Sequence, residues 1–243
     1  MNFVLDVHCH TVNSTHAYST ISENAEHAAS IGLTHIGISD HAPAMPGGAH
    51  LYHFVNIWSL PDIIKGVRVF KGAEVNIMNE RGKVDLENNF LKNMDFVIAA
   101  MHRGVLPALN RKADTNALIN AMENPHVHII GHPLGAWYEI DVEALVEAAA
   151  RTHTILEVNE KSINPGSNRY NGDEDSVKML ELCKEMDVPV LVSSDAHFCT
   201  EVGSFNNAKT LIESAGLKES LVLNTNVELF LNAIQRKRQV AFS

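Results

Sequence analysis

The segment Phe3-Val4-Leu5-Asp6-Val7-His8-Cys9-His10 is a short apolar run that ends in two histidines. Six more runs of this kind follow it, and several are nearly continuous in valine and isoleucine, as in parallel strands that are buried on both faces. Together the runs span residues 3–10, 35–40, 67–75, 96–102, 127–132, 155–159 and 189–195. They predict seven strands of one parallel sheet.

Helical patterns lie between these runs. Ser22 is the expected N-cap of a helix that Gly32 ends, and Asp141 is the expected N-cap of a helix over 142–151. Further helices are expected from Asp173 or Asp175 to about Met186, and near 113–122, 205–215 and 227–238. Strand and helix alternate along the whole chain without a linker, which predicts an α/β fold in a single domain over residues 1–243.

The composition excludes several classes of protein. The chain of 243 residues carries 19 basic and 29 acidic side chains, so its formal charge of −10 offers no electrostatic surface for duplex nucleic acid. No apolar run approaches the roughly 18 residues of a membrane span. Asp6 interrupts the apolar start, which has no basic segment, so we expect no signal peptide. Three cysteines argue against a disulfide scaffold and for a reducing, cytoplasmic location.

A polar residue stands at or next to the end of each predicted strand. In order, these residues are His10, His41, Glu74, His102, His132, Asn159 and Asp195, at intervals of 27 to 36 residues. Because one strand–helix unit takes about 30 residues, they fall at equivalent points of successive units and should gather at one rim. Barrel enzymes carry their active sites at the rim formed by the C-terminal ends of the strands. Seven strands, rather than eight, indicate either a distorted barrel or a hidden strand at 51–57.

Two pairs of polar residues have the spacing that puts side chains on one face of a strand. His8 and His10 lie two residues apart, so both imidazoles should approach one cation, with Asp6 on the same face as an orienting carboxylate. Asp195 and His197 share a face by the same rule. A buried carboxylate at this position needs a metal ion, another cation or several hydrogen-bond donors.

Nine candidate metal ligands therefore gather at the predicted rim. Seven histidines with two carboxylates suit zinc, manganese or iron better than calcium or magnesium, and they are too many for one ion. Two or three ions would use them, with Glu74 bridging through its two oxygens. Taken singly, each has an ordinary alternative, such as a surface position for His16 or a salt bridge for Glu74. The candidates are His8, His10, His16, His41, Glu74, His102, His132, Asp195 and His197.

The same residues resemble the motifs of the PHP (polymerase and histidinol phosphatase) family. The matching motifs are His8-x-His10, Ser39-Asp40-His41, Glu74, His102, Gly131-His132-Pro133 and Ser194-Asp195-Ala196-His197. The added His16 and the compact length are similar to the YcdX-like branch of single-domain phosphatases. The resemblance runs from His8 to His197 and the remaining helices fit it, so it covers essentially the whole chain.

The resemblance implies a distorted TIM-like (β/α)7 barrel with a metal cluster at the C-terminal rim of the strands. It implies three ions, with zinc first and manganese or iron as alternatives. The implied ligand sets are His8, His10, Glu74 and Asp195 for the first ion, Glu74, His102 and His132 for the second, and His16, His41 and His197 for the third. The implied enzyme is a phosphatase or phosphoesterase that attacks phosphorus with a hydroxide held between two metals.

Other residues are candidates for handling a small phosphorylated substrate. Arg103 directly follows a predicted ligand and is expected to act in catalysis and to contact phosphate, while Lys161 and Arg169 are expected phosphate contacts. All three are also explained as ordinary surface or barrel-end residues. Asp40 precedes a ligand and would either donate a proton or orient that ligand. The connection 42–56 is either a lid over the rim or a plain loop. The loop after Arg103 matches no substrate-specific subgroup, so the substrate stays open.

Two other functions fit part of the pattern. An amidohydrolase-like, metal-dependent hydrolase of C–N or lactone bonds shares the His-x-His strand and the late aspartate, but often carries a lysine where this chain has His102. Amide and lactone substrates, compared with phosphoesters, separate the two enzymes. A non-catalytic metal-binding scaffold predicts closed coordination and no turnover. Small members of the family suggest a homo-oligomer, with a trimer as the first expectation, and no interface is readable from the residues.

Overall fold

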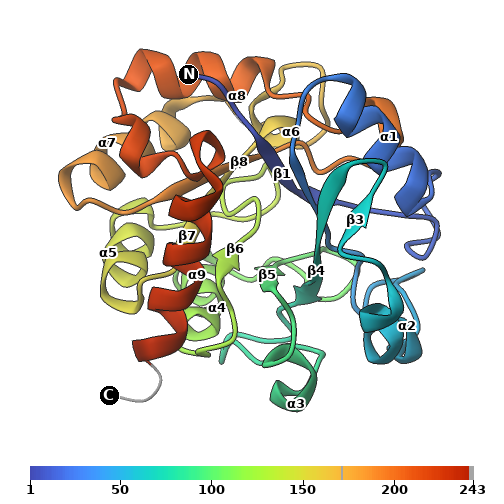
Figure 1. Ribbon diagram of the computed structural model, residues 1–243. Coiled ribbons are helices and arrows are strands. Elements are labelled where there is room, and N and C mark those ends of the chain that lie inside the picture. Colours follow the sequence, from blue (N-terminus) through green and yellow to red (C-terminus); the bar gives the residue numbers. More distant parts are fainter. Residues whose placement is uncertain (171, 241–243) are drawn as a thin grey trace.

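Seven parallel strands form a nearly closed barrel in the computed structural model, which describes residues 1–170 and 172–240 (Figure 1). The end of the predicted domain at residue 243 lies outside the described residues. The strands pair in the order β1 (Leu5–Cys9), β2 (His35–Ile38), β4 (Val67–Asn76), β5 (Phe96–Ala100), β6 (Ile129–Ile130), β7 (Ile155–Asn159) and β8 (Val190–Ser193). A short β3 (Ile63–Ile64) pairs antiparallel with β4. This confirms the predicted distorted TIM-like barrel.

The longest strand, β4, accounts for part of the distortion. Its first half pairs with β2, from His35 opposite Arg68 to Ile38 opposite Lys71. Its second half pairs with β5, starting at Gly72 opposite Phe96. From Gly72 onward the strand pairs with β5, while the backbone of Glu74 still bonds to Asp40 and Ala42 in the segment after β2.

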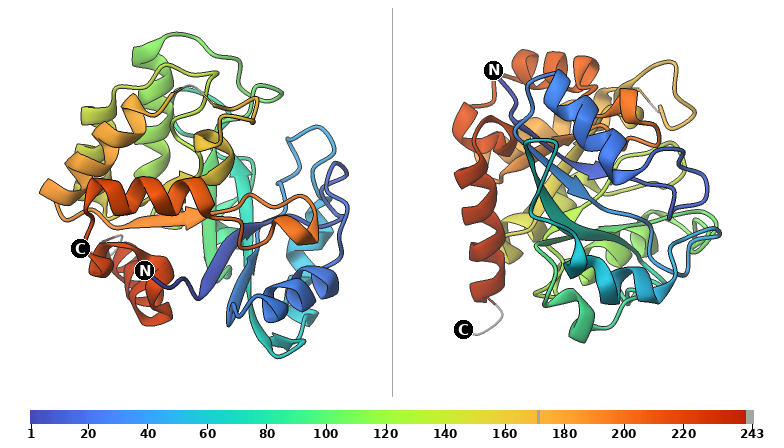
Figure 2. Two further views of the ribbon diagram at one scale, coloured as in Figure 1. Left: turned by 90° about the horizontal axis from the view of Figure 1, so that it is seen from above. Right: turned by 45° about the vertical axis from the view of Figure 1, so that its right-hand side comes forward.

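Helices surround the strands in Figures 1 and 2 and cover the outer face of the sheet. They are α1 (Ile21–Ser30), α2 (Leu51–Asn56), α3 (Asn88–Leu91), α4 (Arg111–Met122), α5 (Val142–Thr152), α6 (Glu160–Ile163), α7 (Glu174–Glu185), α8 (Asn206–Ala215) and α9 (Val227–Val240). Every helix expected from the sequence is present. No described helix combines the length and the apolar character that crossing a membrane requires.

Two local expectations were wrong. Thr20, not Ser22, caps α1: its hydroxyl accepts from the Glu23 backbone N–H, and the Glu23 carboxylate accepts from the Thr20 backbone N–H, as in a capping box. The alternative of a hidden strand at 51–57 also fails. Residues Leu51–Asn56 form α2, with the His50 imidazole accepting from the Tyr52 backbone N–H at its start.

The apolar interior of the barrel is filled from the end opposite the predicted rim. Phe96 is fully buried there, and a Cβ atom added at Gly37 or Gly72 would come within 2.6 or 2.3 Å of its ring. Both positions therefore need glycine so that the ring can fit against the sheet. Phe230 and Ile234 of α9 pack into the same interior cluster, so α9 closes this end of the barrel.

Between β8 and β1 the described residues form no regular strand ladder: a single backbone bridge joins Cys9 to Ala196 just after β8, and a side chain closes the rest. The amide of the fully buried Asn224 donates to the carbonyls of Leu5 (3.0 Å) and Val192 (2.7 Å) and accepts from the Val192 backbone N–H (2.7 Å). The Asn224 backbone carbonyl accepts from Val4 as well. One asparagine thus satisfies backbone groups on both strand edges, which would otherwise be buried without partners.

We expect Asn224→Ala to lower the free energy of unfolding by about 3 kcal/mol, because it leaves buried backbone groups of β1 and β8 without partners. Urea unfolding followed by circular dichroism measures the loss. Asn232→Ala, at an exposed position of α9, is the matched control and should change little. Equal midpoints for the two variants would refute the closing role of Asn224.

Candidate metal centre

The nine side chains predicted to bind metal come together at the C-terminal rim of the barrel. His8 and Glu74 lie within β1 and β4, and the others lie on the loops that leave the strands. Most are fully or almost fully buried, and only His16, His132 and His197 are partly exposed. The gathering follows from the parallel sheet, in which equivalent points of successive strand–helix units meet at one end.

Glu74 occupies the centre of this cluster and is 0% exposed. Five imidazoles surround its carboxylate, at nitrogen–oxygen distances of 2.6 Å for His41, 2.9 Å for His132, 3.2 Å for His102, 3.4 Å for His8 and 3.6 Å for His10. Yet the nearest nitrogen, Nδ1 of His41, makes no hydrogen bond within the described part of the chain, and neither does Oε2 of Glu74. Oε1 of Glu74 does form a hydrogen bond with Nε2 of His132, but Nδ1 of His41 and Oε2 of Glu74 are close because they face a common space.

Asp195 forms a second centre beside the first. Its Oδ1 lies 3.2 Å from Nε2 of His10 and 3.7 Å from Nε2 of His8, again without a hydrogen bond among the described residues. Its Oδ2 accepts from the Arg169 guanidinium and, at 3.4 Å, from the Asn159 amide. Oδ2 of Asp195 is therefore bound by side chains outside the cluster, while Oδ1 points into the cluster.

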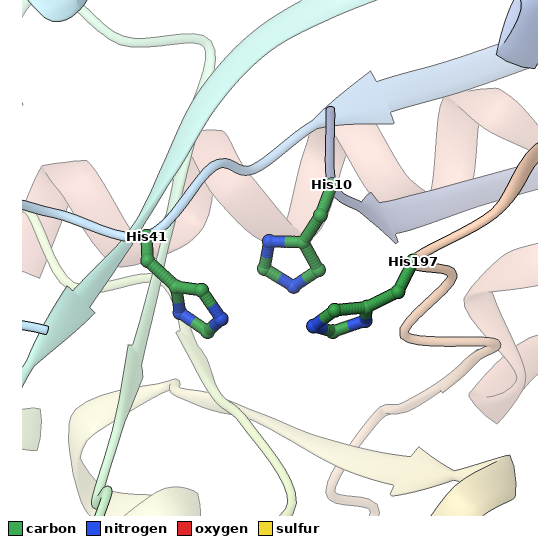
Figure 3. Close-up of side chains that lie close together, drawn as sticks. All are labelled: His10, His41 and His197. Atoms are coloured by element: carbon green, nitrogen blue, oxygen red, sulfur yellow. The ribbon is translucent and has the colours of Figure 1, made fainter. Parts of the chain in front are cut away.

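A group of imidazole rings covers the remaining side. Figure 3 shows His10, His41 and His197 pointing toward one space from three different segments. The ring centroids of His10 and His41 are 4.2 Å apart, and His16 stands 4.9 Å from both His41 and His197. The loop residue His16 thus joins the rim as the sequence predicted.

Four sets of ligand atoms lie close enough, within 4.8 Å of one another, to hold a metal ion. The sets are His10, His41 and His197; His8, His132 and Asp195; His8, His10 and Glu74; and His41, Glu74 and His102. They share members, so one contiguous cluster is present instead of separate sites. The predicted division of ligands among three ions does not follow from these sets alone.

Burial sets the charge state of the rim. It lowers the pKa of both His102 and His197 to about 4, against the opposing attraction of Glu74 and Asp195. For Glu74 burial acts in the raising direction, but His41, His102 and His8 outweigh it and hold the pKa well below its usual range. Near neutral pH His102 and His197 are thus neutral imidazoles and Glu74 is an ionised carboxylate, which are the forms that bind metal ions. His8 differs, because the carboxylates of Glu157, Asp195 and Glu74 outweigh its burial and raise its pKa well above the usual value.

A third carboxylate, Glu157 of β7, holds the cluster from behind. Its Oε1 accepts from Nδ1 of His8 at 2.6 Å and from the Ser193 hydroxyl. Its Oε2 accepts from the His132 backbone N–H at 2.6 Å and the Asn159 amide at 3.0 Å. This role of Glu157 was not predicted. Its place two residues before Asn159, on the same strand face, was the available signal.

Asp6 does not orient an imidazole as expected. The pairing of β1 with β2 is irregular between Asp6 and Cys9, so the two-residue rule breaks there. The carboxylate of Asp6 instead accepts from the Ser194 hydroxyl (2.5 Å) and the Gly203 backbone N–H (2.9 Å). Asp6 therefore positions the segment that carries Asp195, which follows β8.

Asp40 is fully buried beneath the loop that follows β1. Its carboxylate accepts from the backbone N–H and hydroxyl of Thr11 and from the Ser14 hydroxyl, all at 2.7 Å. The Ser14 hydroxyl in turn accepts from the backbone N–H of the predicted ligand His41 at 3.0 Å. Nε2 of His53 lies 3.3 Å from the same carboxylate. These contacts favour the orienting role of Asp40 over that of a proton donor.

The predicted phosphate contacts differ in their surroundings. Arg169 is bound to Asp195, whereas Arg103 is exposed, and both guanidinium groups lie about 6 Å from the Trp137 ring, at 6.0 and 5.8 Å. Nζ of Lys161 lies 3.2 Å from Glu201 and 3.3 Å from Nδ1 of His197. Lys161 is therefore engaged beside a candidate ligand, while Arg103 has the greatest freedom to meet a substrate.

Comparison with known proteins identifies the family. The model of the PHP domain family matches residues 6–163. A protein of Thermoanaerobacter sp. (strain X514) named "probable phosphatase" is 44% identical over 240 residues, covering 98% of this chain and 97% of its own length. One of the same name from Acetivibrio thermocellus is 37% identical over 239 residues, covering 98% of both chains.

A solved structure has the same fold. The crystal structure of histidinol phosphate phosphatase from Lactococcus lactis, described as complexed with zinc, L-histidinol and phosphate, matches with a TM-score of 0.62. The two chains are 18% identical, and the match covers 88% of this chain and 94% of the other. The likeness extends to the whole barrel.

We expect Glu157→Gln to weaken metal binding by about 10- to 100-fold, because an amide cannot accept from all four donors that meet this carboxylate. Competition with a chromophoric chelator measures the affinity. Glu147→Gln, exposed on α5, is the matched control. Unchanged affinity in a folded Glu157→Gln protein would contradict the role of Glu157 behind His8.

Proposed function

The chain belongs to the PHP domain family and is a phosphatase of that family, and we propose that it hydrolyses a small phosphorylated substrate at a cluster of zinc-type ions. The rim would hold the ions and the arginines beside it would receive the phosphate. The set of ligand atoms at the rim that have no hydrogen-bond partner among the described residues is the observation that supports this function most strongly.

The donor set fits a metal cluster. Among the described residues, buried polar atoms without a hydrogen-bond partner include Nε2 of His8 and His102, both ring nitrogens of His10 and His41, Oε2 of Glu74 and Oδ1 of Asp195. Leaving so many buried polar atoms unsatisfied costs about 1–3 kcal/mol each, which is a cost that a fold does not carry without compensation. Divalent ions would satisfy these lone pairs together.

Three ions remain our proposed number, with zinc first and manganese or iron as alternatives. His8, His10, Glu74 and Asp195 would hold one ion, Glu74, His102 and His132 a second, and His16, His41 and His197 the third. The overlap of the four close ligand sets favours ions that share ligands. When bound, such ions lower the pKa of coordinated water and neutralise charge that develops on phosphate oxygens.

The residues around the rim would bind and orient the phosphate group. Arg169, held by Asp195, presents a fixed cation next to the cluster. Three loops are tied together here: the Tyr138 hydroxyl donates to the Leu106 carbonyl (2.6 Å), and the Ala136 backbone N–H donates to the Arg169 carbonyl (3.1 Å). Arg103, which lies near the same Trp137 ring as Arg169, would also meet the phosphate, and Lys161 would support it beside His197.

The two rival functions are weaker. For an amidohydrolase-like enzyme, a lysine is frequent where His102 stands, and here Glu74 and His102 face each other at 3.2 Å. A non-catalytic scaffold does not account for arginines gathered beside the cluster. The names of relatives that are 44% and 37% identical favour phosphate chemistry. A homo-oligomer, with a trimer as the first expectation, and a cytoplasmic location stay predictions.

We expect Glu74→Gln and His102→Ala each to lower the turnover of p-nitrophenyl phosphate by at least about 100-fold and to reduce the bound metal, because each removes a ligand from the centre of the cluster. His126→Ala, three residues before β6 and at the opposite end of that strand from His132, is the matched control. Metal analysis of the purified proteins accompanies the assay. Full activity in both variants, or activity that survives complete removal of metal by a chelator, would refute the proposed site. Faster turnover of amide or lactone substrates would favour the rival enzyme.

Arg103→Gln should raise KM for the substrate and the inhibition constant of inorganic phosphate by about 10-fold while leaving metal content unchanged, since Arg103 lies beside the cluster without touching a ligand. Steady-state kinetics with phosphate as an inhibitor test this. Arg111→Gln, an exposed arginine at the start of α4, serves as the control. A phosphate inhibition constant that does not move would exclude Arg103 as a phosphate contact.

A further inference from the structure

We propose that Asp85 is a positioning residue that acts through Asn76 on His102 and determines which ring nitrogen of His102 faces the cluster. Asp85 lies on the segment between β4 and α3 and is only partly buried. Its consequence for metal binding rests on the function proposed above, whereas its effect on the His102 ring does not.

Three donors meet the carboxylate of Asp85. Its Oδ1 accepts from the Asn76 backbone N–H at 2.8 Å, and its Oδ2 accepts from the Asn76 amide at 2.7 Å and the Ala44 backbone N–H at 2.9 Å. An ionised carboxylate only accepts hydrogen bonds. The group of Asn76 that faces Asp85 must therefore be its NH2 group.

The orientation of Asn76 follows from its other neighbours as well. The same NH2 group lies 3.2 Å from the carbonyl oxygen of Ala42, which is also an acceptor only. The amide oxygen of Asn76 must then be on the opposite side, where it lies 2.8 Å from Nδ1 of His102. A flipped amide would turn its oxygen toward two acceptors and its NH2 group toward the imidazole.

The orientation of Asn76 in turn determines the tautomer of His102. Because the amide oxygen accepts, Nδ1 of His102 must carry the proton and donate it. Nε2 is then left with a lone pair, and it lies 3.2 Å from Oε1 of Glu74 without a hydrogen-bond partner in the described structure. Asp85 thus makes Nε2 of His102 a metal-binding nitrogen without touching the ring.

The same carboxylate also holds the loop that follows His41. Its bond to the Ala44 backbone N–H anchors this loop, and the Ala42 backbone N–H donates to the Glu74 carbonyl at 2.9 Å. The Asn76 amide bonds both to Asp85 and to the Ala42 carbonyl, so it is a second link between this loop and the carboxylate. Asp85 therefore links the segment behind one candidate ligand, His41, to the ring of another, His102, on a different strand.

The decisive variant is Asp85→Asn, which replaces one acceptor oxygen by a donor where three N–H groups converge. Asn76 is then free to flip, and His102 gains access to the tautomer protonated at Nε2. Nitrogen NMR of the labelled imidazoles in metal-free protein reads the tautomer directly. We expect His102 to be protonated only at Nδ1 in the wild type and to show a mixture in the variant. Glu87→Gln, exposed on the same segment, is the matched control and should retain the wild-type spectrum.

A second measurement separates positioning from general structural damage. Asp85→Asn and Asn76→Ala should each weaken zinc binding by about 10- to 100-fold, and the loss in the double variant should be clearly smaller than the sum of the two single losses, because both changes break the chain of contacts to His102. Additive losses would overturn the proposal, as would an unchanged His102 tautomer in Asp85→Asn. If Asp85→Asn does not fold, Asn76→Ala decides: a ring still protonated only at Nδ1 overturns it.

These results remain distinct from a failure of the proposed phosphatase chemistry. A shifted tautomer in a protein whose wild type hydrolyses no phosphoester supports the positioning role and refutes the proposed function. If His102 keeps its tautomer in Asp85→Asn, and Glu74→Gln abolishes the phosphatase activity of the wild type, the positioning role is refuted and the proposed function is supported.

Discussion

The burial of the Glu74 carboxylate is the constraint on which the rim of the barrel depends. The side chain is 0% exposed, and a charge in such a position is tolerated only when other groups compensate for it. The compensation here comes from imidazoles on four other segments, none of which is adjacent to Glu74 in the sequence. To bring them together the chain must pass the same rim once for every strand, and this is what the parallel barrel does.

The sequence predicts this rim well because its signal is periodic. His10, His41, Glu74, His102, His132 and Asp195 recur once per strand–helix unit, and a parallel sheet converts equal spacing along the chain into closeness in space. The seven strand runs and the helices between them rest on the same local patterns of apolar residues. These parts of the fold could therefore be predicted without knowledge of any long-range contact.

The expectations that failed depend on contacts that no local pattern contains. Asp6 faces Ser194 because the pairing of β1 with β2 is irregular between Asp6 and Cys9, and the two-residue rule assumes a regular strand. Residues 51–57 contain bulky apolar side chains in a short run, which fits a strand or a helix until the rest of the fold decides between them. The strand position of Glu157 was a weak signal, but the roles of Glu157 and Asn76 depend on their partners His8 and His102, which lie far away in the sequence.

The two ends of the barrel differ in whether their buried groups find partners within the protein. At the closed end, Phe96, Phe230 and Asn224 satisfy packing and backbone hydrogen bonds within the protein itself. At the rim, the ligand atoms of His10, His41 and Glu74 have no such partners among the described residues, so the fold there depends on something added to it. This division also bears on charge. The chain carries a formal −10, and three divalent ions would add about +6 at one rim, beside Arg103 and Arg169. A protein that is acidic overall would then attract phosphate at its rim, where buried polar atoms of the described residues lack hydrogen-bond partners.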